Sequence, residues 1–312
     1  MENKENFEIN ENEFVDIQEL FIIFYKSKLF ILFFTFTVTV CSALYAFKLP
    51  NIYSSEALLE IKSNSSSGIS SSLSQYSGLA SMAGISMPGN ESGDKGNLAI
   101  EIIKSRDFLK HIISYDDSLV KLFATKKYDH NLKKIIYDED LYNIKNKSWV
   151  RLLSGNKKSI PSYLEAHKFY IEKTLNISRD KQSGFISISI SHISPQFAEY
   201  FLTLIISQAN EIARTDALDS SSKAINYLNT AALNTQVQEV RKSINSLIES
   251  QIETQMLASI NDDFLLKVID APFIPEEKSN PQRILIIAIG FLASLFVSLG
   301  LVAMNFYILK KV

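Results

Sequence analysis

Few side chains in this sequence are of the types that carry out chemistry, and their spacing assembles no catalytic site. The single cysteine, Cys41, lies inside a long apolar run, where we expect no nucleophile. The four histidines are scattered without a histidine partner four residues away, so we interpret them as structural or exposed. The acidic cluster Asp138-Glu139-Asp140 invites comparison with glycosidase carboxylates, but adjacent residues do not provide the separation that such a pair needs. We interpret this cluster as a solvated loop.

Composition and missing motifs exclude further classes of protein. The chain has 312 residues and a formal net charge of −2, which gives no reason to expect a nucleic-acid partner. One cysteine supports neither an intramolecular disulfide framework nor a multi-cysteine zinc or iron–sulfur site. The sequence contains no H-E-x-x-H, no G-x-S-x-G and no phosphate-binding G-x-x-x-x-G-K-[ST]. We therefore predict no catalytic residues, no cofactor and no bound metal, and interpret the chain as a protein that is not an enzyme.

Two apolar runs without charge lie near the ends of the chain. Residues 29–47 have no charge over 19 positions, and residues 284–309 have none over 26. A helix that crosses a bilayer needs roughly 20 such residues, so both runs are long enough to span. No A-x-A cleavage site follows the first run, which favours a retained anchor over a cleaved signal peptide.

Charge at the flanks of these runs predicts their orientation. Lys26 and Lys28 precede the first run, and Lys310 and Lys311 follow the second. The positive-inside rule then places both ends of the chain in the cytoplasm. The predicted organisation is a cytoplasmic tail with an amphipathic helix (1–28), a transmembrane helix (29–48), an extracytoplasmic α/β domain (49–282), a second transmembrane helix (283–309) and a short cytoplasmic tail (310–312).

The domain between the spans combines short strands with a very long helix. Alternating apolar and polar residues predict strands at 53–61 and 185–191, and the largely apolar run at 264–271 is interpreted as a third strand. Ser194 and Pro195 are typical of a helix start, with Ser as the N-cap and Pro as the first helical residue. After Pro195 no Pro or Gly occurs before residue 260. The apolar spacing predicts a long helix over about 195–260, with a hinge or break at 219–222. A helix of this length must pack on neighbours, so we predict a homo-oligomer.

Two segments of the domain leave alternatives open. Residues 63–97, rich in Ser and Gly, are expected to form a mobile loop, which is either a surface flap or the lining of a subunit interface or lumen. Residues 98–125 have helical apolar spacing. Residues 121–181 carry 14 Lys and Arg against 7 Asp and Glu. This surplus indicates either solvated helix faces or a surface that binds an acidic glycan or a partner.

In this arrangement the sequence resembles the Wzz-type polysaccharide co-polymerases, the chain-length determinants of O-antigen and related polysaccharides. The resemblance runs through VDIQELFIIFYKSK before the first span, LPNIYSSEALLEI after it, SKAINYLNTAALNTQVQEVRKSI in the long helix and LLKVIDAPFIPEEKSNPQR before the second span. It implies an α+β fold in which two terminal transmembrane helices flank a periplasmic domain with a small mixed sheet and a very long helix. It also implies a bacterial inner membrane as the location.

The family's proline motif, P-x2-P-x4-S-P-K, is partly present in this sequence. Its prolines correspond to Pro272, Pro275 and Pro281. Asn280 and Gln282 replace the Ser and Lys, and Arg283, one position later, is expected to supply the basic charge. The G-x3-G that the family places in its second span corresponds to Ser294 and Ser298. Together with Gly290 these residues form a ridge of small side chains that permits close helix–helix approach.

Three function classes follow from these observations. The resemblance implies a scaffold whose subunits assemble and regulate the chain length of an O-antigen or related surface polysaccharide, together with a polymerase in the same membrane and with the nascent glycan as a further candidate partner. The alternative is an adaptor for capsule or exopolysaccharide export that pairs with an outer-membrane channel or a separate kinase. An envelope enzyme acting on glycans is the third class, and the absent motifs disfavour it.

Overall fold

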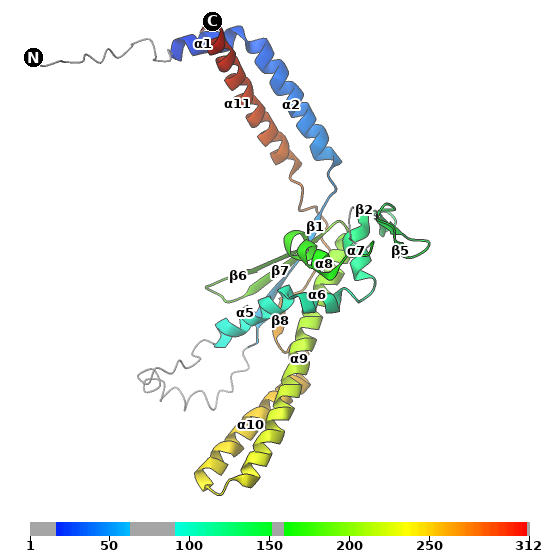
Figure 1. Cartoon of the computed structure of the whole chain (residues 1–312), viewed down its shortest axis with the longest axis vertical. Helices are drawn as coiled ribbons and strands as arrows, with labels where there is room; N and C mark the ends of the chain where they lie inside the picture. Colours follow the sequence, from blue (N-terminus) through cyan, green and yellow to red (C-terminus); the bar gives the residue numbers. More distant parts are fainter. Residues whose placement is uncertain (1–16, 63–90, 152–158, 311–312) are drawn as a thin grey trace, which may run out of the picture. The chain divides into compact units, whose positions relative to one another are not determined.

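The computed structural model describes residues 17–62, 91–151 and 159–310, and it divides into two compact units. One unit consists of the two ends of the chain, up to Asn51 and from Asn280, and the other of Ile52–Ser279. The fold is α+β with a long apolar helix near each end of the chain, as predicted (Figure 1).

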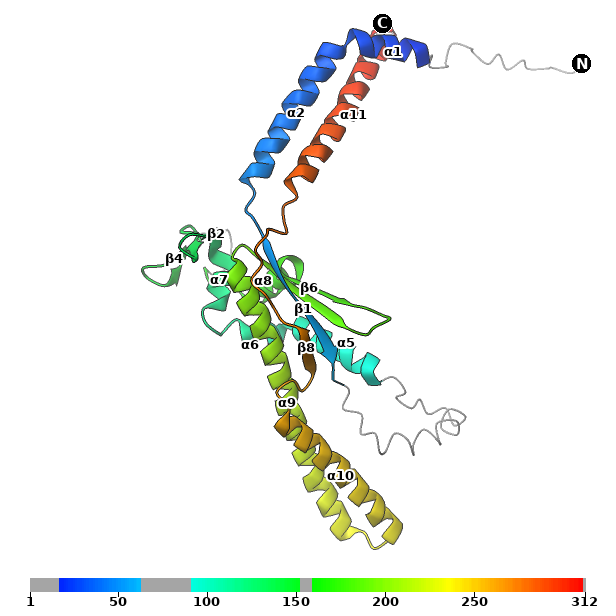
Figure 2. The same cartoon turned by 180° about the vertical axis from the view of Figure 1, so that it is seen from behind.

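Three helices and short connections make up the described part of the first unit. The two long helices of this unit lie side by side, and the short helix lies across one end of the pair (Figures 1 and 2). The first long helix ends at Lys48 because Leu49 takes the extended conformation (φ −68°, ψ 137°) that the following proline favours. The three helices are α1 (Ile17–Lys26), α2 (Lys28–Lys48) and α11 (Arg283–Lys310).

A four-stranded antiparallel sheet is the frame of the second unit. Its strand order is β6-β7-β1-β8, and every neighbouring pair runs antiparallel, so the prediction of a mixed sheet was wrong. The reason is directional: β1 leads away from the first apolar helix, whereas β8 leads back toward the second. The strands are β1 (Tyr53–Ile61), β6 (Leu175–Arg179), β7 (Ile186–His192) and β8 (Leu266–Asp270).

The three predicted strands are confirmed within two residues at each end, and the structure adds β6 and two small hairpins that sequence patterns did not reveal. The helical stretch predicted at 98–125 is three short helices, and the first begins at Glu91, inside the predicted loop. The rest of that loop, residues 63–90, lies outside the described residues. The added elements are α5 (Glu91–Lys104), α6 (Arg106–Ile112), α7 (Ser118–Ala124), β2 (Thr125–Asp129), β3 (Lys134–Tyr137), β4 (Tyr142–Asn143), β5 (Ser148–Trp149), α8 (Tyr163–Phe169) and the π-helical turn η2 (Tyr170–Thr174).

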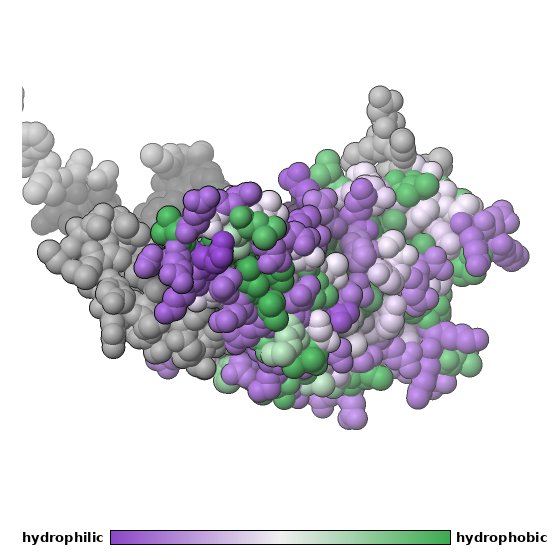
Figure 3. Space-filling model, turned by 90° about the horizontal axis from the view of Figure 1, so that it is seen from below, coloured by the Kyte–Doolittle hydropathy of each residue, from purple (hydrophilic) through white to green (hydrophobic). Residues whose placement is uncertain are grey.

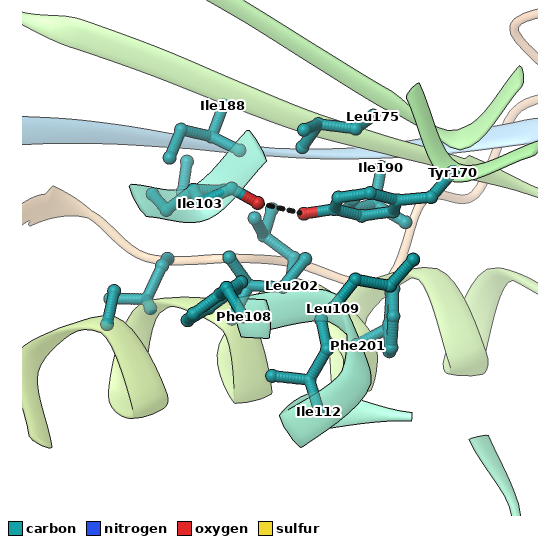
Figure 4. Close-up of a cluster of buried hydrophobic side chains, with 14 of the residues drawn as sticks. Ile103, Phe108, Leu109, Ile112, Tyr170, Leu175, Ile188, Ile190, Phe201 and Leu202 are labelled. Atoms are coloured by element: carbon teal, nitrogen blue, oxygen red, sulfur yellow. Dashed lines mark hydrogen bonds between the residues drawn. The ribbon is translucent and has the colours of Figure 1, made fainter. Parts of the chain in front are cut away.

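The core of the second unit lies between the sheet and the first turns of α9 (Pro195–Asn234). Ser194 begins this helix as predicted, because its hydroxyl accepts a hydrogen bond from the backbone N–H of Phe197. The isoleucines of β7 face buried side chains of α9 and α6 (Figure 4). Tyr170 is fully buried among them, and its hydroxyl donates to the carbonyl of Ile103 at 3.3 Å. Burial raises the pKa of this phenol, so it stays neutral and keeps its donor.

The long helical stretch folds back on itself as two helices. Helix α9 ends at Asn234, and α10 (Gln238–Ile260) returns along it as the second arm of a hairpin (Figures 1 and 2). The turn contains neither Pro nor Gly; instead Thr235 and Val237 are extended. The guanidinium of Arg241 donates to the Thr235 carbonyl at 3.0 Å, which satisfies a carbonyl left free at the helix end.

The predicted hinge at 219–222 is wrong, because α9 continues through it without interruption. The Ser221 hydroxyl donates to the carbonyl of Ala217 at 2.6 Å, so it is satisfied within the helix. Asp219 and Lys223, one turn apart, form an ion pair at 2.6 Å. Hydrogen bonding inside the helix therefore offsets the low helix propensity of this serine run.

Asn210 joins α9 to strand β8 through its side-chain amide. The amide nitrogen donates to the carbonyl of Leu266 at 2.9 Å. Its Oδ1 accepts from the backbone N–H groups of Leu265 and Leu266 at 2.9 and 2.7 Å. All three bonds are buried, so this one side chain satisfies the backbone groups at the start of β8.

We expect Asn210→Ala to lower the free energy of unfolding by about 2–4 kcal/mol, because it leaves buried backbone groups without partners. Thermal or denaturant unfolding of the detergent-solubilised full chain measures this change. Asn229→Ala is the matched control on the exposed surface of the same helix, and it should change stability by less than about 0.5 kcal/mol. Equal effects of the two substitutions would contradict the assigned role of Asn210.

His192 is a buried neutral imidazole at the end of β7. Its Nε2–H donates to the carbonyl of Lys121 at 3.0 Å, and its Nδ1 accepts from the Ser194 N–H at 3.0 Å. Burial lowers the pKa of His192 to about 4, against an ordinary value of 6.5. Because the unfolded chain binds this proton more readily, His192 favours folding above pH 6.5 and loses that contribution as the pH falls toward 4.

Acidification from pH 7 to pH 4 should therefore lower the free energy of unfolding by about 3 kcal/mol through this residue alone. Unfolding of the full chain across this pH range, compared with His192→Gln, isolates the contribution, because other titrating groups are common to both proteins. The variant should be less stable at neutral pH but should lose less on acidification. Parallel pH profiles of the two proteins would contradict the assignment.

Candidate functional site

Helices α2 and α11 are in close contact where Gly290 faces Ser42. A Cβ at position 290 would lie 2.5 Å from Ser42 Oγ and 2.7 Å from Ser42 Cβ, closer than side-chain atoms pack. The Ser42 hydroxyl donates to the backbone carbonyl of Ile286 at 3.2 Å, which joins the two helices by a hydrogen bond. Position 290 thus requires glycine because another helix occupies the space of a side chain.

The rest of the predicted ridge, Ser294 and Ser298, is also buried within this helical unit. Both residues follow Gly290 at intervals of four, so the three lie along one face of α11. Their hydroxyls donate back to the carbonyls of Phe291 and Leu295, both at 2.8 Å, and so need no partner on another helix. The ridge therefore packs within one chain, and a role in assembly between chains stays a prediction.

The prolines of the predicted motif lie on the extended connection that leads from β8 to α11: Pro272, Pro275 and Pro281. Hydrogen bonds to the backbone of this connection attach it to the second unit, and Pro275 is itself buried. The Ser55 hydroxyl donates to the carbonyl of Phe273 at 2.7 Å, and the N–H of Ser279 donates to the carbonyl of Ile52 at 2.9 Å. The connection therefore runs along β1 as far as Ser279.

Arg283, the predicted basic residue of the motif, begins α11 and contacts the end of α2. Its Nη2 donates to Asn51 Oδ1 at 2.9 Å. Its guanidinium carbon lies 5.5 Å from the centroid of the Phe47 ring, a cation–π distance. Arg283 thus joins the adjacent ends of the two long helices, and in this unit its role is structural.

The residues considered for chemistry have structural roles in the described part of the chain. His111, His130 and His167 form hydrogen bonds to a glutamine, a tyrosine hydroxyl and a backbone carbonyl. Asp138 accepts from the ammonium of Lys126 at 3.1 Å, as a surface ion pair. Among residues 17–62, 91–151 and 159–310, no group of three or more His, Cys, Asp or Glu side chains could hold a metal ion. These histidines and Asp138 therefore each have a hydrogen-bond or ion-pair partner within the fold.

A lysine-lined pocket of the second unit is a feature that no motif indicated. It is formed by side chains of α7, β3 with its preceding turn, and the start of α9, which are up to about 80 residues apart in sequence. Only the positive surplus of residues 121–181 pointed toward it. The periodicity of apolar residues could not predict the pocket, because the pocket depends on how three separate elements pack against one another.

The two apolar helices are long and apolar enough to cross a membrane. The candidate spans are Lys28–Lys48 and Arg283–Phe306, and only 11% of the apolar window of each is buried. A core helix of a soluble protein of this length would be mostly buried. The exposed apolar surface of both helices therefore fits a bilayer environment.

The fold and these helices define an α+β protein with a candidate membrane helix near each end. Residues 13–115 match the model of the family Wzz, described as "Chain length determinant protein". The resemblance stated from the sequence is therefore confirmed over about a third of the chain, which includes α1, α2, β1, α5 and α6. The description names a determinant of length and no reaction.

Two solved structures are similar to this chain at low identity. The match to a "full-length bacterial polysaccharide co-polymerase" covers 95% of this chain and 99% of that protein's chain, at 10% identity and a TM-score of 0.38. The match to a "Fragment of WzzB, Polysaccharide Co-polymerase from Salmonella Typhimurium" covers 74% of this chain and 100% of that fragment, at 10% identity and a TM-score of 0.26. Both TM-scores lie below 0.5, so neither structure defines the arrangement of this chain. No curated protein matches it.

The close approach at Gly290 is testable by substitution. We expect Gly290→Leu to lower the free energy of unfolding by about 1–3 kcal/mol, because the new side chain overlaps Ser42 and forces α2 away from α11. Gly300→Leu is the control on the same helix, since a Cβ there meets nothing within 4 Å. Unfolding of the full chain in detergent measures both, and a similar loss in the two variants would argue against the close contact.

Proposed function

We propose that this chain is a non-enzymatic inner-membrane scaffold that regulates the chain length of an O-antigen or related surface polysaccharide together with its polymerase. The observation that carries the proposal is the match of residues 13–115 to the chain length determinant family. The two candidate membrane helices support a membrane location.

Self-association is the second part of the proposal. The helical hairpin of α9 and α10 exposes large apolar side chains in the single chain, with Leu233 at 85% and Ile260 at 69% exposure. Viewed from below in the orientation of Figure 1, hydrophobic side chains are interspersed with hydrophilic ones on the surface (Figure 3). Contact with further copies of the chain would remove such side chains from water. We expect mass measurement in nanodiscs to give an oligomer, and a monomer alone would contradict this part.

The proposed orientation follows the positive charges at the flanks of the helices. Lys26 ends α1 and Lys28 begins α2. Lys310 ends α11, and Lys311 is the next residue in the sequence. The positive-inside rule assigns these ends to the cytoplasm and the unit Ile52–Ser279 to the periplasm. A cysteine-labelling experiment with a membrane-impermeant reagent would test this orientation at any exposed surface position of the second unit.

Deletion of the gene, followed by gel analysis of surface and intracellular polysaccharide, tests the regulatory function. We expect the modal chain length to be lost while polymer still reaches the surface. Polymer trapped inside the cell would instead support the alternative role in export of capsule or exopolysaccharide. An unchanged length distribution would refute the regulatory proposal.

Complementation with variants of α11 links the function to the helix pair. We expect Ser298→Leu to weaken assembly or shift the modal length, since this buried serine has no room for a larger side chain. Gly300→Leu, at a position with open space, should restore the wild-type pattern. A normal ladder with Ser298→Leu at wild-type expression would count against the role of this ridge.

A further inference from the structure

The lysine-lined pocket has the size and composition of a binding site. Its volume is about 380 Å³, within the ~300–1,000 Å³ range of sites for small molecules and short polymer segments. Lys121 reaches it from α7, Lys133 and Lys134 from the hairpin of β2 and β3, and Tyr200 from α9. Three separate elements thus direct positive charge and an aromatic ring into one concave surface.

Two of the three ammonium groups are available to a ligand. Lys121 is paired with the exposed carboxylate of Asp116, at 2.5 Å, and this pair is nearly neutral. Lys133 and Lys134 have no carboxylate within ion-pair distance in the part of the chain that the structure describes. Asp129, opposite Lys134 in the hairpin, accepts hydrogen bonds through its Oδ1 from backbone N–H groups of the turn. An anion in the pocket would therefore meet a local surplus of positive charge.

The aromatic side of the pocket is held in place. The ammonium of Lys121 lies 5.5 Å from the centroid of the Tyr200 ring, a cation–π contact. The rings of Phe197 and Tyr200 lie 6.4 Å apart, and Phe197 is buried in the core. Tyr200 thus presents a supported ring to the pocket, and its apolar face suits the C–H face of a pyranose.

Polar groups that can pair with sugar hydroxyls complete the lining. Gln196, half-buried at the start of α9, carries both a donor and an acceptor. Burial, with a smaller effect of Asp117, raises the pKa of the Tyr137 phenol, so Tyr137 remains a neutral hydroxyl donor. Ammonium groups, an aromatic face and amide and hydroxyl groups together match a ligand that is both anionic and rich in hydroxyls.

We propose that this pocket binds a carboxylate-bearing sugar unit of an acidic glycan. The carboxylate lies between Lys133 and Lys134, the sugar ring packs on Tyr200, and Gln196 and Tyr137 pair with the ring hydroxyls. This inference rests on the proposed function and deepens it, because it names the chemical class of glycan that the regulator contacts. A recognised acidic sugar repeats along the polymer, so the site would engage the chain in register with its repeat.

Binding to the purified full chain in phosphatidylcholine nanodiscs tests the proposal, with tetragalacturonate as the acidic probe and maltotetraose as the neutral one. We expect tetragalacturonate to bind and maltotetraose to bind at least tenfold more weakly. The double variant Lys133→Gln/Lys134→Gln should bind tetragalacturonate about tenfold more weakly. Lys145→Gln/Lys147→Gln removes two exposed lysines outside the pocket lining, and it should leave the affinity unchanged.

A third variant distinguishes a sugar site from a general anion site. Tyr200→Leu should weaken tetragalacturonate binding but not inorganic phosphate binding, because only the sugar needs the ring. Equal affinities in wild type and Lys133→Gln/Lys134→Gln, no binding of tetragalacturonate, or equal affinity for maltotetraose would each overturn the proposal. Competition by phosphatidylglycerol nanodiscs through the same two lysines would assign the pocket to lipid headgroups, which also overturns it.

The two proposals fail in different ways. If the deletion strain keeps its normal polysaccharide ladder but the purified chain binds tetragalacturonate through Lys133 and Lys134, the proposed function fails and the site stands. If the deletion abolishes modal length but the chain does not bind tetragalacturonate, the regulator stands and the site fails. Neither measurement depends on the outcome of the other.

Discussion

The packing of the first turns of α9 against the isoleucine face of β7 is the interaction on which the second unit depends. Phe201, Leu202 and Ile205 are fully buried on the helix side, and Ile188 and Ile190 are fully buried on the strand side. Burial of such side chains contributes about 1.5–3 kcal/mol each, the largest favourable contribution available to a small sheet. Further along the same helix, Asn210 forms hydrogen bonds to backbone groups at the start of β8. One stretch of helix thus contacts both a central strand and an edge strand of the sheet.

This contact also determines what surrounds it. Because the start of α9 is held against the sheet, its half-buried residues Gln196 and Tyr200 meet the lysines of α7 and of the β2–β3 hairpin. Beyond Ala213 the helix leaves the core, and its apolar side chains need another surface. Helix α10 covers part of that surface, and the remainder stays exposed in the single chain. The core, the pocket and the hairpin are therefore consequences of one packing arrangement.

The helical unit follows a different principle from the second unit. When the surroundings of two helices are as apolar as their side chains, burying those side chains between the helices provides little attraction. Close packing of the two helices then contributes more to their association. Gly290 and the buried serines of α11 permit that packing against α2, while the hydroxyls bond back to their own helix. The small-residue ridge that sequence analysis associated with assembly is occupied by a helix of the same chain, because α2 and α11 run side by side.

Local pattern and length in the sequence determined the features that depend on neighbouring residues alone. These include the two apolar helices, the strand of alternating Ile and Ser at 186–192, and the start of α9 at Ser194-Pro195. The tertiary structure alone decided the strand directions, the turn at 235–237 and the packing partner of Gly290. The serine run at 219–222 looked like a hinge because low propensity is a local property, whereas the hairpin turn is placed by contact between α9 and α10. Likewise, the sequence determined a positive surplus over 121–181, but only packing of three distant elements decided that part of it lines a pocket beside Tyr200.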